Sequence, residues 1–299
     1  MDFDKPGKSI EQQIAQLTER GMFIDNPERV ADYLSNISYY RLSAYWYTFI
    51  EAPVDEHRFK EGTHFAQVIE TYVFDRKLRL LLFDEIERIE VALRTQMIHH
   101  FCLEFGNWYE NPELFPCREY HHKFMDLIEE EIAKSNEKFI AHYRSKYTNP
   151  RNPPCWMTLE LASFGQLSSL YKNVKTCAAK KNVAEHFKVD ETILSSWLEF
   201  IAVLRNRCAH HARTWNKQLP KRPKIPTHPK QKWLTFAPKR ENFNRVYVSV
   251  AIVLYLLKCI VPTTTFVTRF KNLLKEYPAI PRAYMGFPDN WEEDHFWDV

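Results

Sequence analysis

Glycine is scarce in this chain, which has 6 glycines among its 299 residues. Tight turns between strands often need glycine, whereas a glycine inside a helix is less favourable than alanine by roughly 1 kcal/mol. Few glycines therefore favour long helices over a sheet built from hairpins. The sequence predicts an all-α fold, and a 45% share of hydrophobic residues is sufficient for a folded core.

Clustered cysteines are also absent. The six cysteines are Cys102, Cys117, Cys155, Cys177, Cys208 and Cys259. They lie far apart, and no Cys-x-x-Cys pair occurs, so the sequence offers no zinc-binding cluster. We expect free thiols in a reducing, cytoplasmic setting, with no metal and no other cofactor.

Long hydrophobic runs are lacking as well. The most apolar segment, 246–261, contains Ser249 and Lys258, which make it too short and too polar to span a bilayer. We interpret it as a buried helix. Residues 1–13 contain no apolar segment of the kind found in signal peptides. These features predict a cytoplasmic protein without a membrane partner.

Acidic residues are missing from one stretch of the chain. From Arg205 to Arg240 there are eleven Lys and Arg residues but no Asp or Glu, although the net charge of the whole chain is only +3. Four prolines make the middle of this stretch extended. We predict a Pro-rich basic loop that contacts a phosphate backbone; the alternative is a basic loop that only faces solvent. The candidate RNA contacts are Arg207, Lys217, Lys221, Arg222 and Lys224.

Helical periodicity is strongest between residues 65 and 105, where neither Gly nor Pro occurs. Glu90 and Arg94 lie one turn apart beside the apolar stripe of this segment. Such a pair is either a solvated ion pair or a support for polar groups on another helix. We also expect one helix over 119–147, another over 156–171 that is interrupted near Gly165, and an N-cap at Asp190.

Arginine, asparagine and histidine gather where an apolar helical segment, 193–204, ends. The cluster is Arg205-Asn206-Arg207-Cys208-Ala209-His210, with His211 and Arg213 following. Cleavage of RNA by its own 2′-OH needs a base, a cation that stabilises the phosphorane-like transition state, and an acid for the leaving 5′ oxygen. Histidine, with a free pKa of about 6.5, can serve as base or acid, and arginine presents a planar fork to two phosphate oxygens. This chemistry requires no metal.

The spacing of these residues predicts how they share a helix face. The predicted stripe consists of Glu199, Asn206, His210 and Arg213, which are seven, four and three residues apart. Arg205 precedes His210 by five residues, about 140° around a helix axis, so its side chain has to curl back to reach the same anion. His211 is expected to point about 100° away from His210. The structural alternative is a helix end at which Arg and His merely cap carbonyl groups.

The motif and its surroundings resemble a known family. Segment 205–210 fits the Arg-x(4–6)-His motif of HEPN ribonucleases, in its Arg-Asn-x-x-x-His form. The wider chain is similar to the Abi-like (abortive-infection, AbiD/AbiF-type) bacterial phage-defence proteins. The segments that carry this likeness are 5–6, 9–13, 17–21, 39–42, 74–79, 88–90, 156–157, 164–165, 205–210 and 285–288, with Tyr45, Arg94 and Arg213.

The resemblance implies an α-helical HEPN-like fold and a homodimer whose two motifs meet in a cleft. It implies a metal-independent endoribonuclease that acts as a toxin against the infected cell, with RNA as substrate and a non-coding RNA as a possible regulatory partner. Abi-like proteins of this kind also look related to the HEPN domains of RNA-targeting CRISPR effectors. On the motif, Arg205 and His210 take the catalytic positions and Asn206 a supporting one, and Glu90 and Arg94 match a polar pair in the first long helix. A second histidine from the dimer partner then completes the two proton transfers.

The resulting prediction is one Abi-like domain over 1–299. It consists of an N-terminal helical extension (1–62), a HEPN-like helical core (63–280) and a tail (281–299). Two other functions remain open at this point. One is a non-catalytic RNA-binding or regulatory module that binds a small non-coding RNA, and the other is a helical scaffold for protein interactions.

Overall fold

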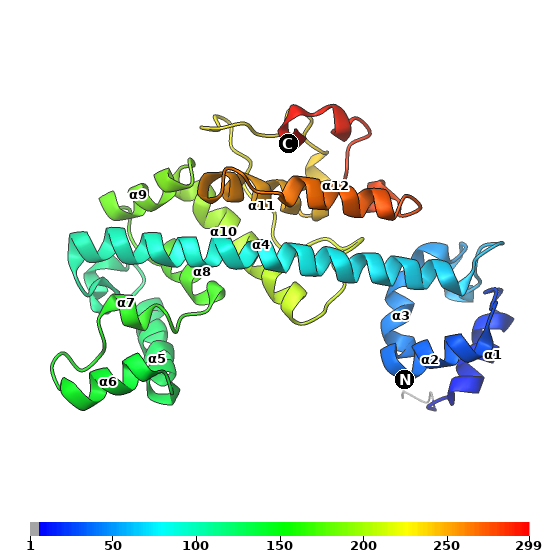
Figure 1. Cartoon of the computed structure of the whole chain (residues 1–299), viewed down its shortest axis with the longest axis horizontal. Helices are drawn as coiled ribbons and strands as arrows, with labels where there is room; N and C mark the ends of the chain where they lie inside the picture. Colours follow the sequence, from blue (N-terminus) through cyan, green and yellow to red (C-terminus); the bar gives the residue numbers. More distant parts are fainter. Residues whose placement is uncertain (1–5, 299) are drawn as a thin grey trace. The chain divides into compact units, whose positions relative to one another are not determined.

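The chain is all-α throughout the part described by the computed structural model, residues 6–298 (Figure 1). Twelve α-helices and several short 3₁₀ turns occur there, with two isolated β-bridges and no strand among these residues. The predicted fold class is confirmed. Lys5, part of a segment that carries the family resemblance, lies outside the described residues.

Two compact units divide the chain. Unit 1 consists of Met1–Leu78 and Leu273–Ile280, described from residue 6 onward, and unit 2 of Arg79–Asn272 and Pro281–Val299, described up to residue 298. The longest helix, α4 (Phe65–Phe105), contributes residues to both units and coincides with the segment in which glycine and proline are absent. The sequence-based division at residues 62 and 280 stays a prediction.

Unit 1 contains α1 (Ile10–Glu19), α2 (Pro27–Ile37), α3 (Tyr39–Trp46) and the first turns of α4. Capping residues define these boundaries. Ser9 and Gln12 form a capping box at the start of α1, and the Asn26 side chain accepts the backbone N–H of Arg29 at the start of α2. In the core, the Tyr45 hydroxyl donates to Asp75 Oδ2 over 2.7 Å, which satisfies a buried carboxylate.

Unit 2 is built around α10 (Glu191–Ala209), which packs against α8 (Phe164–Asn173), α9 (Ala178–His186) and α11 (Val246–Ile260). Twelve of the fifteen residues of α11 are buried, so this helix is apolar on all sides because it is enclosed by protein. No helix among the described residues has the length and apolar composition needed to cross a membrane. The other helices of the unit are the C-terminal part of α4, α5 (Arg118–Lys134), α6 (Lys138–Lys146), α7 (Cys155–Thr158) and most of α12 (Phe266–Glu276).

Two predicted helices differ in detail from the structure. The single helix expected over 119–147 is two helices, because α5 ends at Lys134 and α6 begins at Lys138. Ser135 and Asn136 lie between them, and both residue types favour helix ends over helix interiors. The break in 156–171 falls at 159–163 instead of at Gly165, because Ser163 forms a capping box with Gln166 that begins α8.

The cysteine prediction is wrong for two of the six residues. Cys102, on α4, and Cys155, at the start of α7, form a disulfide. The two lie 53 positions apart in the sequence, and only the fold of unit 2 brings them together. Cys117, Cys177, Cys208 and Cys259 form no disulfide within residues 6–298, as expected. The disulfide joins α7 to the long helix α4.

Candidate functional site

The candidate site lies at the C-terminal end of α10. Asp190 begins this helix, since its Oδ1 accepts the backbone N–H groups of Thr192 and Ile193 over 2.9 Å each, and this N-cap confirms the prediction. Nine residues of α10 are buried, which fixes its orientation within unit 2. The helix therefore holds Arg205 and Asn206 on its last two turns in a defined position.

The helix ends directly at the motif, in a Schellman arrangement. His210 is the C-cap, the His211 N–H donates to the Cys208 carbonyl over 3.2 Å, and the Ala212 N–H donates to the Arg207 carbonyl over 2.9 Å. His211 occupies the position where glycine is usual, with a φ of +55°. The chain therefore turns away from the helix axis immediately after His210.

This ending corrects the predicted stripe. Asn206 lies on α10, but Arg213 lies beyond the end of the helix and does not continue its face. For the same reason the 100° offset expected for His211 does not apply. The Arg207 guanidinium instead donates to the Arg213 carbonyl, and this contact fastens the segment after the helix back onto α10.

Arg205 is held by two residues of α4. Its Nε lies 3.7 Å from Glu90 Oε2, and its guanidinium carbon lies 5.5 Å from the centre of the Phe83 ring. Phe83 and Glu90 are seven residues apart on α4, nearly two turns, and so share one face. The Arg205 side chain is 30% exposed, and no hydrogen bond occupies its terminal nitrogens among residues 6–298. These nitrogens form the part of the guanidinium that can bind two phosphate oxygens.

Arg94 anchors Glu90 from the other side. Arg94 Nη2 donates to Glu90 Oε1 over 3.1 Å and to the Ala162 carbonyl over 3.0 Å, while Arg94 Nε donates to the Leu159 carbonyl over 3.0 Å. The side chains of Glu90 and Arg94 are 13% and 11% exposed. The pair is therefore not a solvated ion pair. It is partly buried and supports Arg205, a polar group on another helix, which is the other interpretation that the sequence left open.

The charge of this arrangement follows from its members. One carboxylate, Glu90, is shared by two guanidinium groups, Arg94 and Arg205. The three side chains together carry one positive charge, because arginine remains protonated throughout the physiological range, and the half-exposed Glu160 carboxylate lies 4.0 Å from Arg94 Nε. That charge lies on the exposed side of the group, at Arg205, while Arg94 is held by backbone carbonyls.

His210 and Asn206 face solvent. Both residues are exposed, and neither side chain has a hydrogen-bond partner within residues 6–298. The two are linked through the backbone, since the His210 N–H donates to the Asn206 carbonyl over 2.9 Å. An imidazole in this position is accessible to a ligand in solution.

The basic stretch is partly neutralised by acidic residues from elsewhere in unit 2. Glu199 Oε1 accepts from Lys221 Nζ over 2.6 Å and from Lys172 Nζ over 3.0 Å. Although burial alone raises the pKa of Glu199, these two ammonium groups hold the pKa below its usual value of 4.5. Lys230 pairs with Glu185 in the same way.

Among the predicted RNA contacts, Lys217 and Arg222 are exposed and have no carboxylate partner within residues 6–298. Lys224 is also exposed, and its backbone fixes the loop onto α10. Its N–H donates to Ser196 Oγ over 2.9 Å, and its carbonyl accepts from Trp197 Nε1 over 2.8 Å. The loop is therefore positioned by its main chain, which leaves these three side chains free to face solvent.

Sequence reasoning missed several residues of this group. Phe83 had no distinguishing signal except its spacing of seven from Glu90. The carbonyls of Leu159 and Ala162 belong to a segment that was expected to be helical, where they would bond within the helix. Glu199 was placed on the motif face, but its partners are Lys172 and Lys221.

The fold and the site define an all-helical protein with a solvent-facing Arg/His motif at the end of a buried helix. The chain matches the family described as Abi-like protein over residues 32–216, more than half of its length. It therefore belongs to the Abi-like protein family, and this membership supports a role in abortive infection. No curated protein and no solved structure matches the chain.

Proposed function

We propose that this protein is a cytoplasmic antiphage toxin of the HEPN type, a metal-independent endoribonuclease that cleaves RNA through attack of the 2′-OH. The observation that carries the proposal is the shared carboxylate. Glu90 is shared between Arg94 and Arg205, the terminal nitrogens of Arg205 carry no hydrogen bond within residues 6–298, and His210, five residues later at the end of the same helix, has an accessible imidazole. A phosphate is the ligand that such a guanidinium fork binds best.

The proposed roles follow from chemistry. Arg205 binds the non-bridging oxygens of the scissile phosphate and stabilises the charge that grows there in the transition state. His210 transfers a proton, either from the 2′-OH or to the 5′ oxygen. Asn206, one turn before His210, orients the histidine or the phosphate but cannot titrate. Glu90 and Arg94 position Arg205 and do not touch the substrate.

A homodimer is part of the proposal. One imidazole completes one proton transfer at a time, so a second copy of the motif supplies the other transfer. His211, in the left-handed position directly after His210, is the local alternative to the histidine of a second copy. The dimer is checked by the mass of the protein in solution, and a monomer that cleaves RNA at full rate would contradict this part.

The RNA backbone is proposed to contact the exposed cations of the basic loop. Lys217, Arg222 and Lys224 are available for this contact, whereas Lys221 is already bound by Glu199. Arg207 uses its guanidinium to hold the Arg213 carbonyl, so its part in RNA binding is to shape the helix end. These contacts are expected to position RNA irrespective of its sequence.

The decisive experiment compares His210→Ala with His228→Ala in an RNase assay that contains a chelator. His228 is an exposed histidine of the basic loop, so it is a matched control. We expect His210→Ala to lower the cleavage rate by roughly 10²- to 10⁴-fold, because it removes a general acid or base, and His228→Ala to cleave at the wild-type rate. Unchanged melting temperatures exclude unfolding as the cause.

Two results would contradict the proposal. If His210→Ala cleaved RNA at the wild-type rate, His210 would not be the catalytic histidine. Wild-type protein that binds RNA but yields no product under any condition would favour a non-catalytic RNA-binding module of the same family.

A further inference from the structure

Arg245 lies where the C-terminal tail meets the segment that follows the Arg/His motif. It is the N-cap residue of α11, in unit 2. Its Nη1 donates to Asn216 Oδ1 over 3.3 Å and to the Tyr284 carbonyl over 2.9 Å. Its Nε donates to Asn242 Oδ1 over 3.0 Å. Three separate parts of unit 2 therefore hold this guanidinium in one position.

All three partners of Arg245 are uncharged. The residue has no carboxylate partner within residues 6–298, so it keeps its full positive charge. Its second terminal nitrogen, Nη2, donates no hydrogen bond there and is not buried, so a ligand can reach it. A guanidinium that is already fixed but not neutralised can bind a phosphate with little further loss of side-chain freedom.

The charged side chains next to the anchors of Arg245 in the chain are mostly basic. Three of them are exposed and have no carboxylate partner within residues 6–298: Lys217, Lys239 and Arg240. The acidic residue of the same 3₁₀ turn (Arg240–Asn242) is Glu241, which is exposed. Four cations, with Arg245, against one carboxylate leave a net positive surface, which favours an anionic ligand.

Acidic residues of the tail begin beyond the part that contacts Arg245. That part is the 3₁₀ turn Arg282–Met285, and the first carboxylate after it belongs to Asp289. Two later carboxylates act on other groups. Glu292 acts on Arg282, and Asp294 accepts the backbone N–H groups of residues 235 and 236.

Tyr284 adds an aromatic surface beside this guanidinium. Its carbonyl binds Arg245, while its ring is 36% exposed and stands at 89° to the buried Trp215 ring, with centroids 5.8 Å apart. Gly286, with a φ of +83°, packs so closely that an added Cβ would lie 2.9 Å from Arg245 Cβ. The ring is therefore held in place next to the cation. Aromatic rings beside cations are what proteins use to bind unpaired nucleotides.

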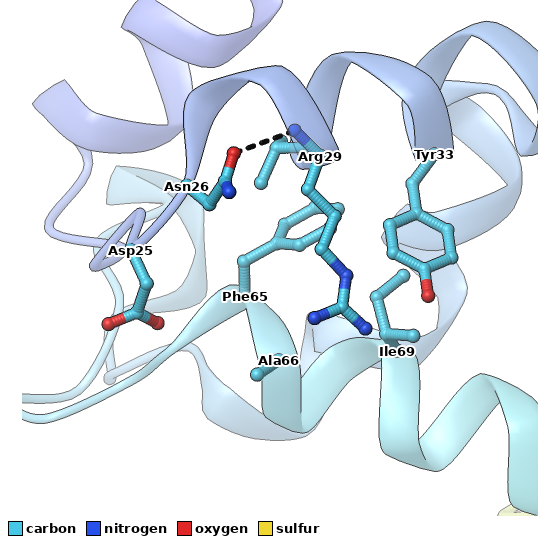
Figure 2. A pocket seen from close by; sticks show the side chains of 8 residues that line it. Asp25, Asn26, Arg29, Tyr33, Phe65, Ala66 and Ile69 are labelled. Carbon is cyan, nitrogen blue, oxygen red and sulfur yellow. Dashed lines mark hydrogen bonds between the residues drawn. The ribbon is translucent and has the colours of Figure 1, made fainter.

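Figure 2 shows a recess in unit 1 in which another guanidinium lies near an aromatic ring. Arg29 lies there 5.8 Å from the centre of the Tyr33 ring. The Asp25 carboxylate lines the same recess, and the Arg29 side chain forms no hydrogen bond within residues 6–298. A carboxylate at the site opposes an anion, and a guanidinium without anchors has to be ordered on binding. Arg245 is therefore the better phosphate site of the two.

We propose that Arg245 and Tyr284 bind one unpaired nucleotide of the RNA, with a backbone phosphate on Arg245 and the base stacked on the Tyr284 ring. The inference rests on the proposed function, which makes RNA the substrate. Asn216, which anchors Arg245, follows His210 by six residues. Six residues of extended chain span at most about 20 Å, so one short RNA strand can reach both sites. The bound nucleotide flanks the scissile phosphate and selects single-stranded RNA.

Titration of a labelled single-stranded oligouridine, followed by fluorescence anisotropy, tests the phosphate contact. The parent protein is His210→Ala, so that the RNA stays intact. Arg245→Ala should raise the dissociation constant roughly tenfold, because it removes a charge-assisted contact. It should also lower the slope of log K against log salt by about 0.7. Arg118→Ala removes an exposed arginine of unit 2 that already pairs with Glu113, and should change neither value.

Substitution of Tyr284 tests the base contact. Its backbone carbonyl, which anchors Arg245, remains in every variant. Tyr284→Leu should weaken binding of the oligouridine at least roughly fivefold, because it removes a stacking surface, and should leave the salt slope unchanged. Tyr284→Phe keeps the ring and should bind like the parent. A duplex RNA of the same length has no unpaired base, so Tyr284→Leu and the parent should bind it equally.

Asn216→Gly separates the fixing of the guanidinium from its charge. Asn216 has a φ of +48°, which glycine adopts readily, so the variant removes Oδ1 and keeps the backbone. We expect an affinity between those of the parent and Arg245→Ala, at the melting temperature of the parent. If Arg245→Ala itself melts early, Asn216→Gly and the Tyr284 variants decide.

Three results would overturn the inference: parent affinity in a folded Arg245→Ala, parent affinity in Tyr284→Leu, or equal losses in Tyr284→Leu and Tyr284→Phe. These titrations involve no cleavage. A wild-type protein that cleaves no RNA would therefore end the proposed nuclease and leave this binding site standing, whereas an active nuclease with none of these binding effects would do the opposite.

Discussion

A guanidinium that binds a phosphate has to be held in place without being neutralised. Arg205 meets both conditions, because its carboxylate partner Glu90 is shared with Arg94 and its opposite side contacts a ring that carries no formal charge. A dedicated carboxylate would hold Arg205 more firmly but would cancel its charge. The Phe83 ring thus helps to orient Arg205 without cancelling its charge, which a second carboxylate would do.

Phe83→Leu tests this contact at the level of one side chain. A cation–π contact at a partly exposed site contributes about 0.5–1 kcal/mol, so we expect RNA cleavage to fall roughly two- to fivefold in kcat/KM. Phe83→Tyr retains the ring and should keep the wild-type value. The pH profile of cleavage should be the same in all three proteins, because Phe83 transfers no proton. Equal losses in the Leu and Tyr variants would show that packing, and not the ring, is responsible.

At the scale of elements, the segment around α7 connects the disulfide with the motif. Cys155 begins α7, and Leu159 and Ala162, a few residues later, supply the carbonyls that hold Arg94. Since Cys102 lies on the same long helix as Arg94, the disulfide and these hydrogen bonds attach the segment to α4 at two places.

Cys155→Ser should therefore destabilise unit 2. Closing a loop of 53 residues in the unfolded chain contributes up to about 4 kcal/mol by the chain-entropy relation. We expect a lower denaturant midpoint for Cys155→Ser, and an equal midpoint for wild type kept under a thiol reductant. Cys117→Ser alters an exposed free cysteine and should behave like oxidised wild type. A wild-type midpoint that does not respond to the reductant would contradict this assignment.

The contact between α10 and the basic loop predicts a pH dependence. The pKa of Glu199 is lowered in the folded state, so its stabilising effect is complete above its usual value of 4.5 and is lost as the pH falls through the folded-state pKa. Glu199→Gln should lower the free energy of unfolding by up to about 1 kcal/mol near neutral pH, given the partial exposure of the pairs. Chemical denaturation should show the two proteins converging below pH 4.5. A difference in the free energy of unfolding that stayed constant down to acid pH would contradict this prediction.

At the scale of the whole molecule, the location of the charged residues is more informative about RNA binding than the net charge. The net charge is +3, yet the basic stretch contains no acidic residue of its own. Folding brings Glu185 and Glu199 to that stretch, and these side chains neutralise Lys230 and Lys221. The number of cations available to RNA is consequently smaller than the sequence suggests.

The salt dependence of RNA binding measures that number. Lys217→Ala combined with Arg222→Ala removes two unpaired cations, so the slope of log K against log salt should fall by about 1.4 for a single-stranded RNA. Lys230→Ala combined with Lys232→Ala is the control, because both lysines have carboxylate partners in the structure. We expect the control to change the slope by less than half as much. Equal changes in both double variants would show that the ion pairs open on binding.

The sequence predicted the elements better than their contacts. The bounds of α4 and the N-cap at Asp190 follow from periodicity, capping residues and the absence of Gly and Pro, which are local properties. The disulfide, the carbonyls around Arg94 and the pairing of Glu199 depend on which helices become neighbours. The stripe with Arg213 failed because a histidine took the left-handed position in which glycine is usual.

The shared carboxylate has a consequence for how related sequences are compared. If Glu90 were replaced by an uncharged residue, segment 205–210 would be unaltered in every letter, yet Arg205 would lose its only carboxylate within residues 6–298. A comparison restricted to the six-residue motif would score that protein as intact. Inactive members of the family should thus be sought first on the long helix, more than a hundred positions before the motif that defines them.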